Sequence, residues 1–270
     1  MIESPWVLWL GAWAGSAVLL AALWFDQRRR LDATLVDVGW TLALGGSALF
    51  YALAADGNGS SRALAGVLGG VWCARLTWHL LKDRVLPGKG EDSRYAYLRA
   101  HWGDRQHAKF FWFYQAQALA AAALSFPYLV IARTPASPID PTIWPFVAGG
   151  VAVYALAMVN EWLADHQLAR FRANPANKGR TCRQGWWRYS RHPNYFFEWL
   201  VWVGLAAAAT PGPGGWWAWG APAAMLLLVT KVSGIPWAEQ QSLRSRGEDY
   251  RRYQRETSAF VPWIPRAEAR

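Results

Sequence analysis

Apolar residues run along this chain in long stretches that are separated by shorter polar segments. About seven of these stretches approach or exceed the roughly 18–20 residues that a helix needs to cross a lipid bilayer. They cover residues 5–25, 35–55, 63–81, 110–132, 143–164, 196–210 and 216–235. The pattern predicts an all-α integral membrane protein with seven transmembrane helices, of which the sixth is the shortest.

Basic residues gather in every second connection between these stretches. Three arginines follow the first stretch, seven Lys or Arg lie in residues 82–109, seven in 170–191 and eight in 231–270. The connections 55–62 and 133–142 carry one arginine each. Because positively charged loops stay in the cytoplasm, we expect the N-terminus outside and the C-terminus in the cytoplasm. An odd number of spans is consistent with this orientation.

Composition supports the membrane assignment. The chain is 53% hydrophobic and only 17% charged, and its 270 residues include 20 Trp, which is too apolar for an ordinary soluble domain. Orientation and contact with anionic lipid account for the net charge of +10, so nucleic-acid binding is not expected. Cys73 and Cys182 indicate neither a disulfide nor a metal site. No internal repeat is visible, and we expect residues 1–270 to form a single membrane domain.

Ionisable side chains inside the stretches mark a candidate site, because charge is costly in a bilayer. Asp37, Arg75 and Glu198 each lie seven residues from the nearest basic residue of a predicted cytoplasmic connection. At about 1.5 Å per residue, each is roughly 10 Å below the cytoplasmic surface, as a cavity open to the cytoplasm requires. Trp40 shares a helix face with Asp37, and Trp72 shares one with Arg75. A buried Asp37–Arg75 pair that only joins two helices is the structural alternative.

The connection between the fifth and sixth stretches interleaves arginines with aromatic rings. Guanidinium groups beside ring faces suit a ligand that carries phosphates and a flat heterocycle. The sequence contains neither GxGxxG nor GxxxxGK[ST], which excludes a Rossmann or P-loop mode of phosphate binding. Pro193 predicts the start of a helix that places Asn194, Tyr195 and Glu198 on one face. A basic loop lying on anionic lipid is the alternative, although lipid headgroups would not need Asn194 and Glu198.

Four segments resemble known families. GWWRYSRHPNYFFEW at residues 185–199 resembles the signature of the membrane sterol reductases. ARLTWHLLKDR at 74–84 and GEDSRYAYLRAHWG at 90–103 resemble the bacterial branch of the steroid 5-alpha-reductase family. The tail EQQSLRSRGEDYRRYQRETSAFVPWIP at 239–265 resembles the C-terminal element of both groups. Together they cover most of the chain from the second stretch onward, and they are consistent with a bacterial inner membrane protein.

The resemblance implies a seven-helix, NADPH-dependent reductase of the C=C bond of an enone, such as a 3-oxo-Δ4-steroid or a related polycyclic lipid. The connections 82–109 and 165–194 and the tail 236–270 would cover the nucleotide, and no metal is implied. Arginines would hold the pyrophosphate and the 2′-phosphate, and Asn194 would orient the nicotinamide carboxamide. The residues implied in nucleotide binding are Asn160, Asp165, Arg170, Arg172, Arg180, Arg183, Tyr189, Arg191, His192, Asn194, Tyr195, Glu198, Glu239 and Tyr250.

Enone reduction needs a hydrogen-bond donor at the carbonyl oxygen. A carboxylic acid among apolar side chains keeps its proton and can donate, which makes Asp37 the first candidate and Tyr95 the second. If Arg75 pairs with Asp37, the aspartate is ionised and a tyrosine must donate. Trp40, Trp72 and Arg75 are the expected substrate-binding residues for a flat apolar lipid.

Two other functions are compatible with parts of the pattern. Isoprenylcysteine-type membrane methyltransferases also carry an RHPxY segment and an acidic tail, and they bind S-adenosylmethionine. That cofactor has no phosphates, so it does not account for seven basic residues between the fifth and sixth stretches. A lipid-binding or scaffold protein without catalytic activity would have no need for Asp37, Arg75 and Glu198 at one membrane depth.

Overall fold

The computed structural model describes residues 1–88 and 90–266, so the last four residues of the predicted tail lie outside it. These described residues are mostly helical and contain no β-strand, which confirms the all-α prediction. Six of their helical segments are long and apolar enough to cross a membrane. The six are Pro5–Arg30, Leu35–Ala54, Gly59–Val85, Ser93–Arg133, Trp144–Ala173 and Gly215–Arg246. Such lengths and composition are those of an integral membrane protein.

The sixth predicted span corresponds to α8, Pro193–Ala209, which has 17 residues. That length is at the lower limit of about 17–25 residues for transmembrane helices. The structure therefore confirms a helix at this position, and the count of seven spans remains a prediction.

Two predicted spans are interrupted. The fourth consists of α5, Gln106–Leu124, and α6, Phe126–Arg133, with Ser125 between them. Pro127 stands in the first turn of α6, where a missing N–H costs little, and it cannot continue the preceding helix. The seventh, residues 216–235, contains α9, Gly220–Leu227, and a π-helical turn over Leu228–Val232, and α10, Ile235–Arg246, begins at its last residue.

The described residues cluster into two compact units, and each is described here by itself. Unit 1 comprises residues 1–145 and 209–218, and unit 2 comprises residues 146–208 and 219–270.

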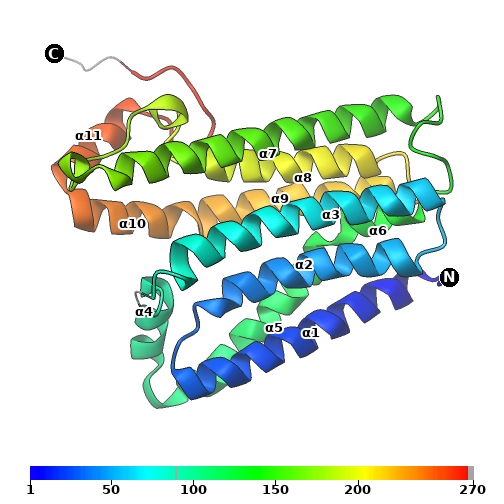
Figure 1. The fold of residues 1–270 in the computed structure, drawn as a ribbon, viewed down its shortest axis with the longest axis horizontal. Helices are drawn as coiled ribbons and strands as arrows, with labels where there is room; N and C mark the ends of the chain where they lie inside the picture. The colour runs from blue at the N-terminus through cyan, green and yellow to red at the C-terminus, as the bar shows by residue number, and fades with distance from the viewer. Residues whose placement is uncertain (89, 267–270) are drawn as a thin grey trace. The chain divides into compact units, whose positions relative to one another are not determined.

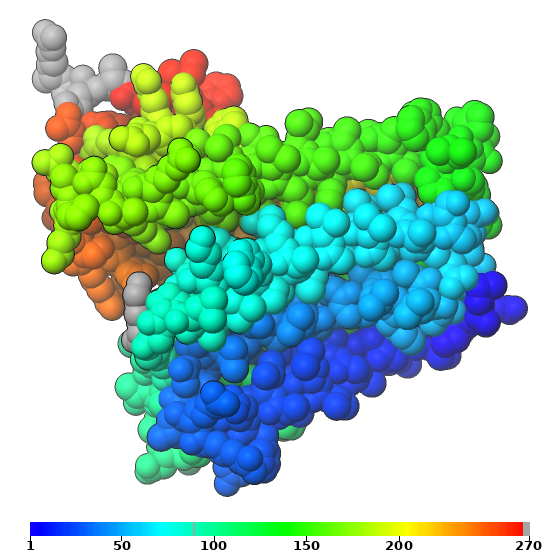
Figure 2. Space-filling model, viewed as in Figure 1, coloured from blue at the N-terminus to red at the C-terminus, as the bar shows by residue number. Residues whose placement is uncertain are grey.

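Unit 1 is a helical bundle. Its helices are α1, Pro5–Arg30; α2, Leu35–Ala54; α3, Gly59–Leu80; α4, Ser93–Trp102; and α5 and α6. Helix α2 packs between α1 and α3, and α1 also packs on α5 (Figure 1). The outer surfaces of α1, α2 and α3 form neighbouring bands from dark blue to cyan in Figure 2. A buried cluster that includes Leu20, Val36, Tyr95, Phe110 and Tyr114 fixes α4 against the bundle.

Unit 2 contains α7, Trp144–Ala173, together with α8, α9, α10 and α11, Glu248–Glu256. Helices α7 and α8 run side by side (Figure 1) and approach closely at two glycines. A Cβ atom on Gly150 would lie 2.6 Å from the Gly204 carbonyl oxygen, and one on Gly204 would lie 2.6 Å from the Tyr154 nitrogen. Glycine at both positions therefore permits backbone contact, and this contact positions the start of α8 beside the C-terminal half of α7.

Candidate functional site

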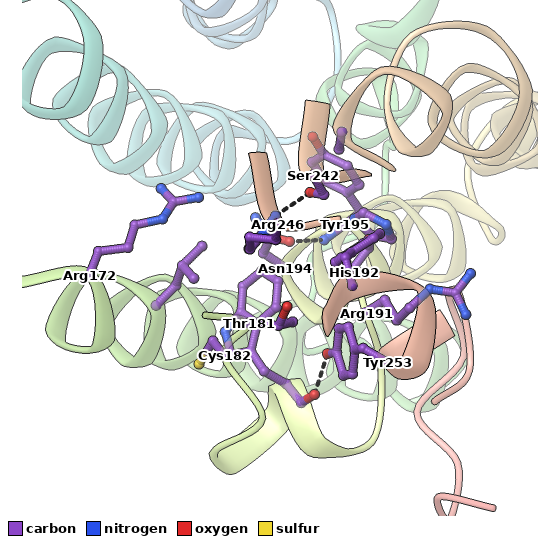
Figure 3. A pocket seen from close by; sticks show the side chains of 14 residues that line it. Arg172, Thr181, Cys182, Arg191, His192, Asn194, Tyr195, Ser242, Arg246 and Tyr253 are labelled. Carbon is purple, nitrogen blue, oxygen red and sulfur yellow. Dashed lines mark hydrogen bonds between the residues drawn. The ribbon is translucent and has the colours of Figure 1, made fainter. Parts of the chain in front are cut away.

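A pocket lies within unit 2, among the end of α7, residues 181–192, the start of α8, and helices α10 and α11 (Figure 3). Its empty space is about 550 Å³ when the open mouth and the solvent in it are included. Its polar lining includes Arg172, Thr181, Asn194, Ser242 and Arg246. No Asp or Glu lines the pocket among the described residues.

The Gly185–Arg188 turn is anchored on α7. The Trp186 indole N–H donates to Asn160 Oδ1 at 3.1 Å, and the Trp187 indole N–H donates to the Ala164 carbonyl at 2.8 Å. Gly185 has φ +57°, and a Cβ atom there would overlap the Gln167 side chain. The two tryptophans therefore attach this turn to α7. The attachment holds the residues that follow, Arg191–Tyr195, at the pocket wall.

The tail closes over this segment from the other side. The Tyr253 hydroxyl bonds to the carbonyls of Trp187 and Ser190, the second at 3.0 Å. The Ser190 hydroxyl donates to the Phe260 carbonyl at 2.7 Å, and the Arg191 backbone N–H donates to Ser258 at 2.8 Å. These bonds join segments more than 60 residues apart in the chain, and they make the tail part of the site.

Arg191 and Glu239 neutralise each other at the edge of the pocket. Arg191 Nε donates to Glu239 Oε1 at 2.7 Å, and its Nη1 donates to the carbonyls of Gln254 and Thr257. Glu239 also accepts from Gln254 Nε2 at 2.9 Å. The pair therefore joins α10 to the loop before α8 and leaves little of the Arg191 charge for a ligand.

His192 stands beside this pair and is almost fully buried. Burial lowers the pKa of His192, although the nearby Glu239 carboxylate partly opposes the shift. Its Nε2 lies 3.4 Å from Glu239 Oε1, and its ring stacks on Tyr195 with centroids 5.5 Å apart. His192 is therefore a neutral packing partner of the tyrosine at neutral pH.

Arg172 and Arg246 are different, because neither has a carboxylate partner anywhere in the described parts of the chain. Arg246 bonds to the Ser242 hydroxyl, and its guanidinium lies over the Tyr250 ring. Its Nε is buried without a hydrogen-bond partner in the described structure, and so is the Thr181 hydroxyl. Two cations and unused polar groups in a pocket without acids attract an anion.

Tyr250 adds a proton donor to the same wall. Burial, together with the charge of Glu239, raises the pKa of Tyr250 to about 12. The phenol therefore keeps its proton at neutral pH and can donate it to an anionic oxygen.

The structure brings part of the predicted nucleotide-binding set to this pocket. The predicted residues that line it are Arg172, Arg191, His192, Asn194, Tyr195 and Tyr250.

Other members of that set hold the pocket wall together. Asp165 accepts from Asn194 Nδ2 at 3.2 Å, and Glu198 accepts from the Trp202 indole at 3.1 Å. Arg183 pairs with Glu256 at 2.9 Å, so its charge is compensated within the tail. The predicted residues that do not line the pocket are Asn160, Asp165, Arg170, Arg180, Arg183, Tyr189, Glu198 and Glu239.

Sequence reasoning missed Thr181, Cys182, Ser242 and Arg246. The spacing of Ser242 and Arg246 was an available signal, because residues four apart share a helix face and Tyr250 follows after four more. Thr181 and Cys182 lie in a loop, where no periodicity indicates the direction of a side chain.

A second polar cluster lies in unit 1 around Asp37. Arg94 Nη2 donates to Asp37 Oδ2 at 2.7 Å, Arg84 donates to the same oxygen, and the Tyr95 hydroxyl donates to Oδ1 at 2.6 Å. Both carboxylate oxygens therefore accept hydrogen bonds, as in an ion pair. This geometry favours the alternative in which a tyrosine, and not Asp37, acts as donor.

Asp92 supports the same cluster. It caps α4 by accepting from the Arg94 backbone N–H at 2.9 Å, and it pairs with the Arg94 side chain at 3.0 Å. Burial alone would raise the pKa of Asp92, but the hydrogen bonds and charge of Arg94 outweigh burial and hold this pKa below its usual value. The capped helix end and the ion pair together fix Tyr95 beside Asp37.

The predicted substrate residues occupy the neighbouring helices of unit 1. Trp40 and Trp72 pack edge to face with centroids 5.8 Å apart, and Trp72 is fully buried. The Trp40 indole N–H is buried without a partner in the described part of the chain. Arg75 lies on the same helix as Trp72 and is half-buried.

A family model described as "Protein of unknown function (DUF1295)" matches residues 23–257. The chain belongs to the DUF1295 family. No curated protein and no solved structure matches it. In this DUF1295 protein, the Asp37 cluster and all the residues that line the unit 2 pocket fall inside the matched region. Among the described residues, no group of three His, Cys, Asp or Glu side chains could hold a metal ion.

Proposed function

We propose that this DUF1295 protein is an NADPH-dependent reductase of an enone C=C bond, with a steroid-like or related polycyclic lipid as substrate. The observation that carries the proposal is that Arg172 and Arg246 line a pocket with no acidic lining residue and form no salt bridge among the described residues. The association of the DUF1295 family with steroid 5-alpha-reductase-like proteins supports the same conclusion.

The residues in the pocket fit the chemical parts of NADPH. Arg172, Arg246 and the Thr181 hydroxyl would bind its phosphates, since guanidinium groups match phosphate oxygens in charge and geometry. One amide hydrogen of Asn194 goes to Asp165, which leaves the second for the nicotinamide carboxamide. The Tyr195 ring supplies an aromatic face near these groups. When bound, NADPH would supply the hydride for the reduction.

S-adenosylmethionine fits this pocket less well. It carries a positive sulfonium and no phosphate, so the guanidinium groups of Arg172 and Arg246 would repel its sulfonium end. The methyltransferase alternative is therefore a possible outcome of the binding test and not a second proposal.

Tyr95 is the proposed proton donor. The Tyr95 hydroxyl has a single proton, and in this structure it donates that proton in a hydrogen bond to Asp37. Donation to a substrate carbonyl requires the hydroxyl to turn from Asp37 to that oxygen. Arg84 and Arg94 then continue to balance the carboxylate. Polarising the oxygen draws electron density from the double bond and makes its β-carbon a better acceptor of hydride.

The orientation also remains a proposal: the N-terminus outside, the C-terminus in the cytoplasm, and a bacterial inner membrane as the location. The alternating distribution of Lys and Arg supports this orientation.

The first test is a titration of the detergent-solubilised protein with NADPH, NADH and S-adenosylmethionine, followed through tryptophan emission. Trp187 lines the pocket, and reduced nicotinamide absorbs where tryptophan emits. We expect saturable quenching by NADPH and weaker binding of NADH, which lacks the 2′-phosphate. Binding of S-adenosylmethionine alone would replace the reductase proposal with the methyltransferase.

A further inference from the structure

The tail carries three exposed apolar side chains on a backbone that is firmly held. We define Val261, Trp263 and Ile264 as the tail ridge; they are 51%, 71% and 77% exposed. The backbone N–H of Trp263 donates to the Tyr189 carbonyl at 2.9 Å. Two prolines, Pro262 and Pro265, restrict the backbone of the ridge. The ridge is therefore a fixed outward-facing surface and not a loose end.

The residue before the ridge connects it to α8. The Phe260 ring packs on Phe196 and Trp199, with centroids 5.6 and 5.9 Å apart. Phe196 and Trp199 lie in the first two turns of α8, an apolar helix that begins at Pro193. The ridge therefore starts beside the turns in which the sequence of this helix changes from polar to mainly apolar residues.

Contacts with α7 place the ridge at the same kind of boundary. Tyr189, which bonds to Trp263, follows the turn that Trp186 and Trp187 attach to Asn160 and Ala164. The apolar part of α7 ends there, because Asp165, His166 and Gln167 come next. Two helices thus independently locate the ridge at the edge of the apolar zone.

We propose that the tail ridge inserts into the interfacial region of the membrane that the chain spans. Tryptophan is favoured at that depth because its ring is apolar and its N–H needs a polar partner. The exposed Arg188, whose guanidinium lies 5.9 Å from the Tyr189 ring centroid, and the exposed Arg266 flank the ridge. The surface therefore suits anionic lipid headgroups. This inference does not rest on the proposed function.

The test uses the full chain in lipid nanodiscs with a nitroxide attached at Trp263→Cys. A second ridge label at Ile264→Cys guards against a local effect of one variant. The matched control is Arg251→Cys on α11, whose native side chain is 65% exposed. The two native cysteines should react little with the nitroxide reagent, since Cys182 is buried and Cys73 is half-buried. The wild-type protein treated with the same reagent gives the background signal.

Oxygen concentrates in hydrocarbon and a neutral nickel chelate stays in water, so their collision rates with the label report its depth. In nanodiscs that contain phosphatidylglycerol, we expect a several-fold higher oxygen-to-nickel ratio at positions 263 and 264 than at 251. Equal ratios at all three positions would overturn the proposal. Protection from both reagents with spin–spin broadening would also overturn it, because a second copy of the chain would then cover the ridge. A lower ratio in pure phosphatidylcholine would support the role of anionic headgroups.

Discussion

The guanidinium carbon of Arg246 lies 5.0 Å from the centroid of the Tyr250 ring, at the wall of the unit 2 pocket. Tyr250 is buried, and the ring provides a favourable but incomplete partner for the cation. A phosphate group could satisfy the remaining hydrogen-bonding capacity of Arg246.

Arg246→Met should therefore weaken NADPH binding. A charge-assisted hydrogen bond contributes about 1.5–3 kcal/mol, so we expect at least about a tenfold loss of affinity, since tenfold corresponds to about 1.4 kcal/mol. Methionine keeps the helix propensity and most of the apolar stem. The measurement is the NADPH titration of tryptophan emission.

Arg244→Met is the matched control for this variant. Arg244 lies two residues away on α10, is exposed, and does not line the pocket. Arg244→Met removes the same charge as Arg246→Met. Equal losses of NADPH affinity in the two variants would show a general charge effect and contradict a phosphate contact at Arg246.

Tyr95→Phe should lower turnover and leave NADPH affinity nearly unchanged. Loss of a positioned proton donor commonly costs about 10²–10⁴-fold in rate, and Tyr95 is not among the residues that line the pocket. The measurement is NADPH oxidation with a 3-oxo-Δ4-steroid, beside the binding titration.

Tyr114→Phe controls for the removal of a buried phenol from the same core cluster. Its hydroxyl has no hydrogen-bond partner among the described residues, so turnover should remain. If both variants lose turnover equally, packing of the cluster and not donation by Tyr95 explains the effect.

His192 should make stability depend on pH. Its pKa in the folded protein is below the ordinary value of about 6.5. At pH values between the lowered pKa of folded His192 and about 6.5, the unfolded chain binds a proton at His192 more readily than the folded chain does. The free energy of unfolding is therefore not reduced by His192 above about pH 6.5, and it decreases as the pH falls below that value. Burial would raise the pKa of Glu239, but hydrogen bonds from His192 and Arg191 outweigh burial and lower this pKa to about 2, so the carboxylate beside the ring stays ionised across this interval.

We expect the thermal unfolding midpoint in detergent to fall from about pH 7 to about pH 5 as His192 is protonated. A His192→Gln variant should have a lower unfolding midpoint at pH 7, because the packing on Tyr195 is altered. Its midpoint should fall less between pH 7 and pH 5 than that of the wild-type protein. An identical pH dependence in the two proteins would show that other groups are responsible.

Orientation can be tested with reporters fused to each end of the chain. If α8 crosses the membrane together with the six longer segments, the termini lie on opposite sides, and the basic tail lies in the cytoplasm. An alkaline phosphatase reporter should then be inactive at the C-terminus and active at the N-terminus. Equal behaviour at both ends would mean an even number of crossings.

Local patterns were sufficient for most of the helices. Apolar stretches predicted most of the membrane segments, because the bilayer sets their length and composition. Pro193 correctly predicted the start of α8, and Asn194 and Tyr195 line the unit 2 pocket, whereas their part in nucleotide binding stays a prediction. The break at Ser125 could have been recognised from Pro127.

The roles of individual arginines were decided only by the tertiary structure. The family resemblance made Arg170, Arg172, Arg180 and Arg183 equal candidates for phosphate binding and placed Arg191 in the wider nucleotide-binding set. The fold pairs Arg183 with Glu256 and Arg191 with Glu239, across 73 and 48 residues. It gives Arg172 no salt bridge within the described parts of the chain and adds Arg246 to the same pocket. In the same way, Asp37 receives Arg84 and Arg94 from 47 and 57 residues away. Charge compensation depends on distance in space, and the order of residues along the chain does not specify that distance.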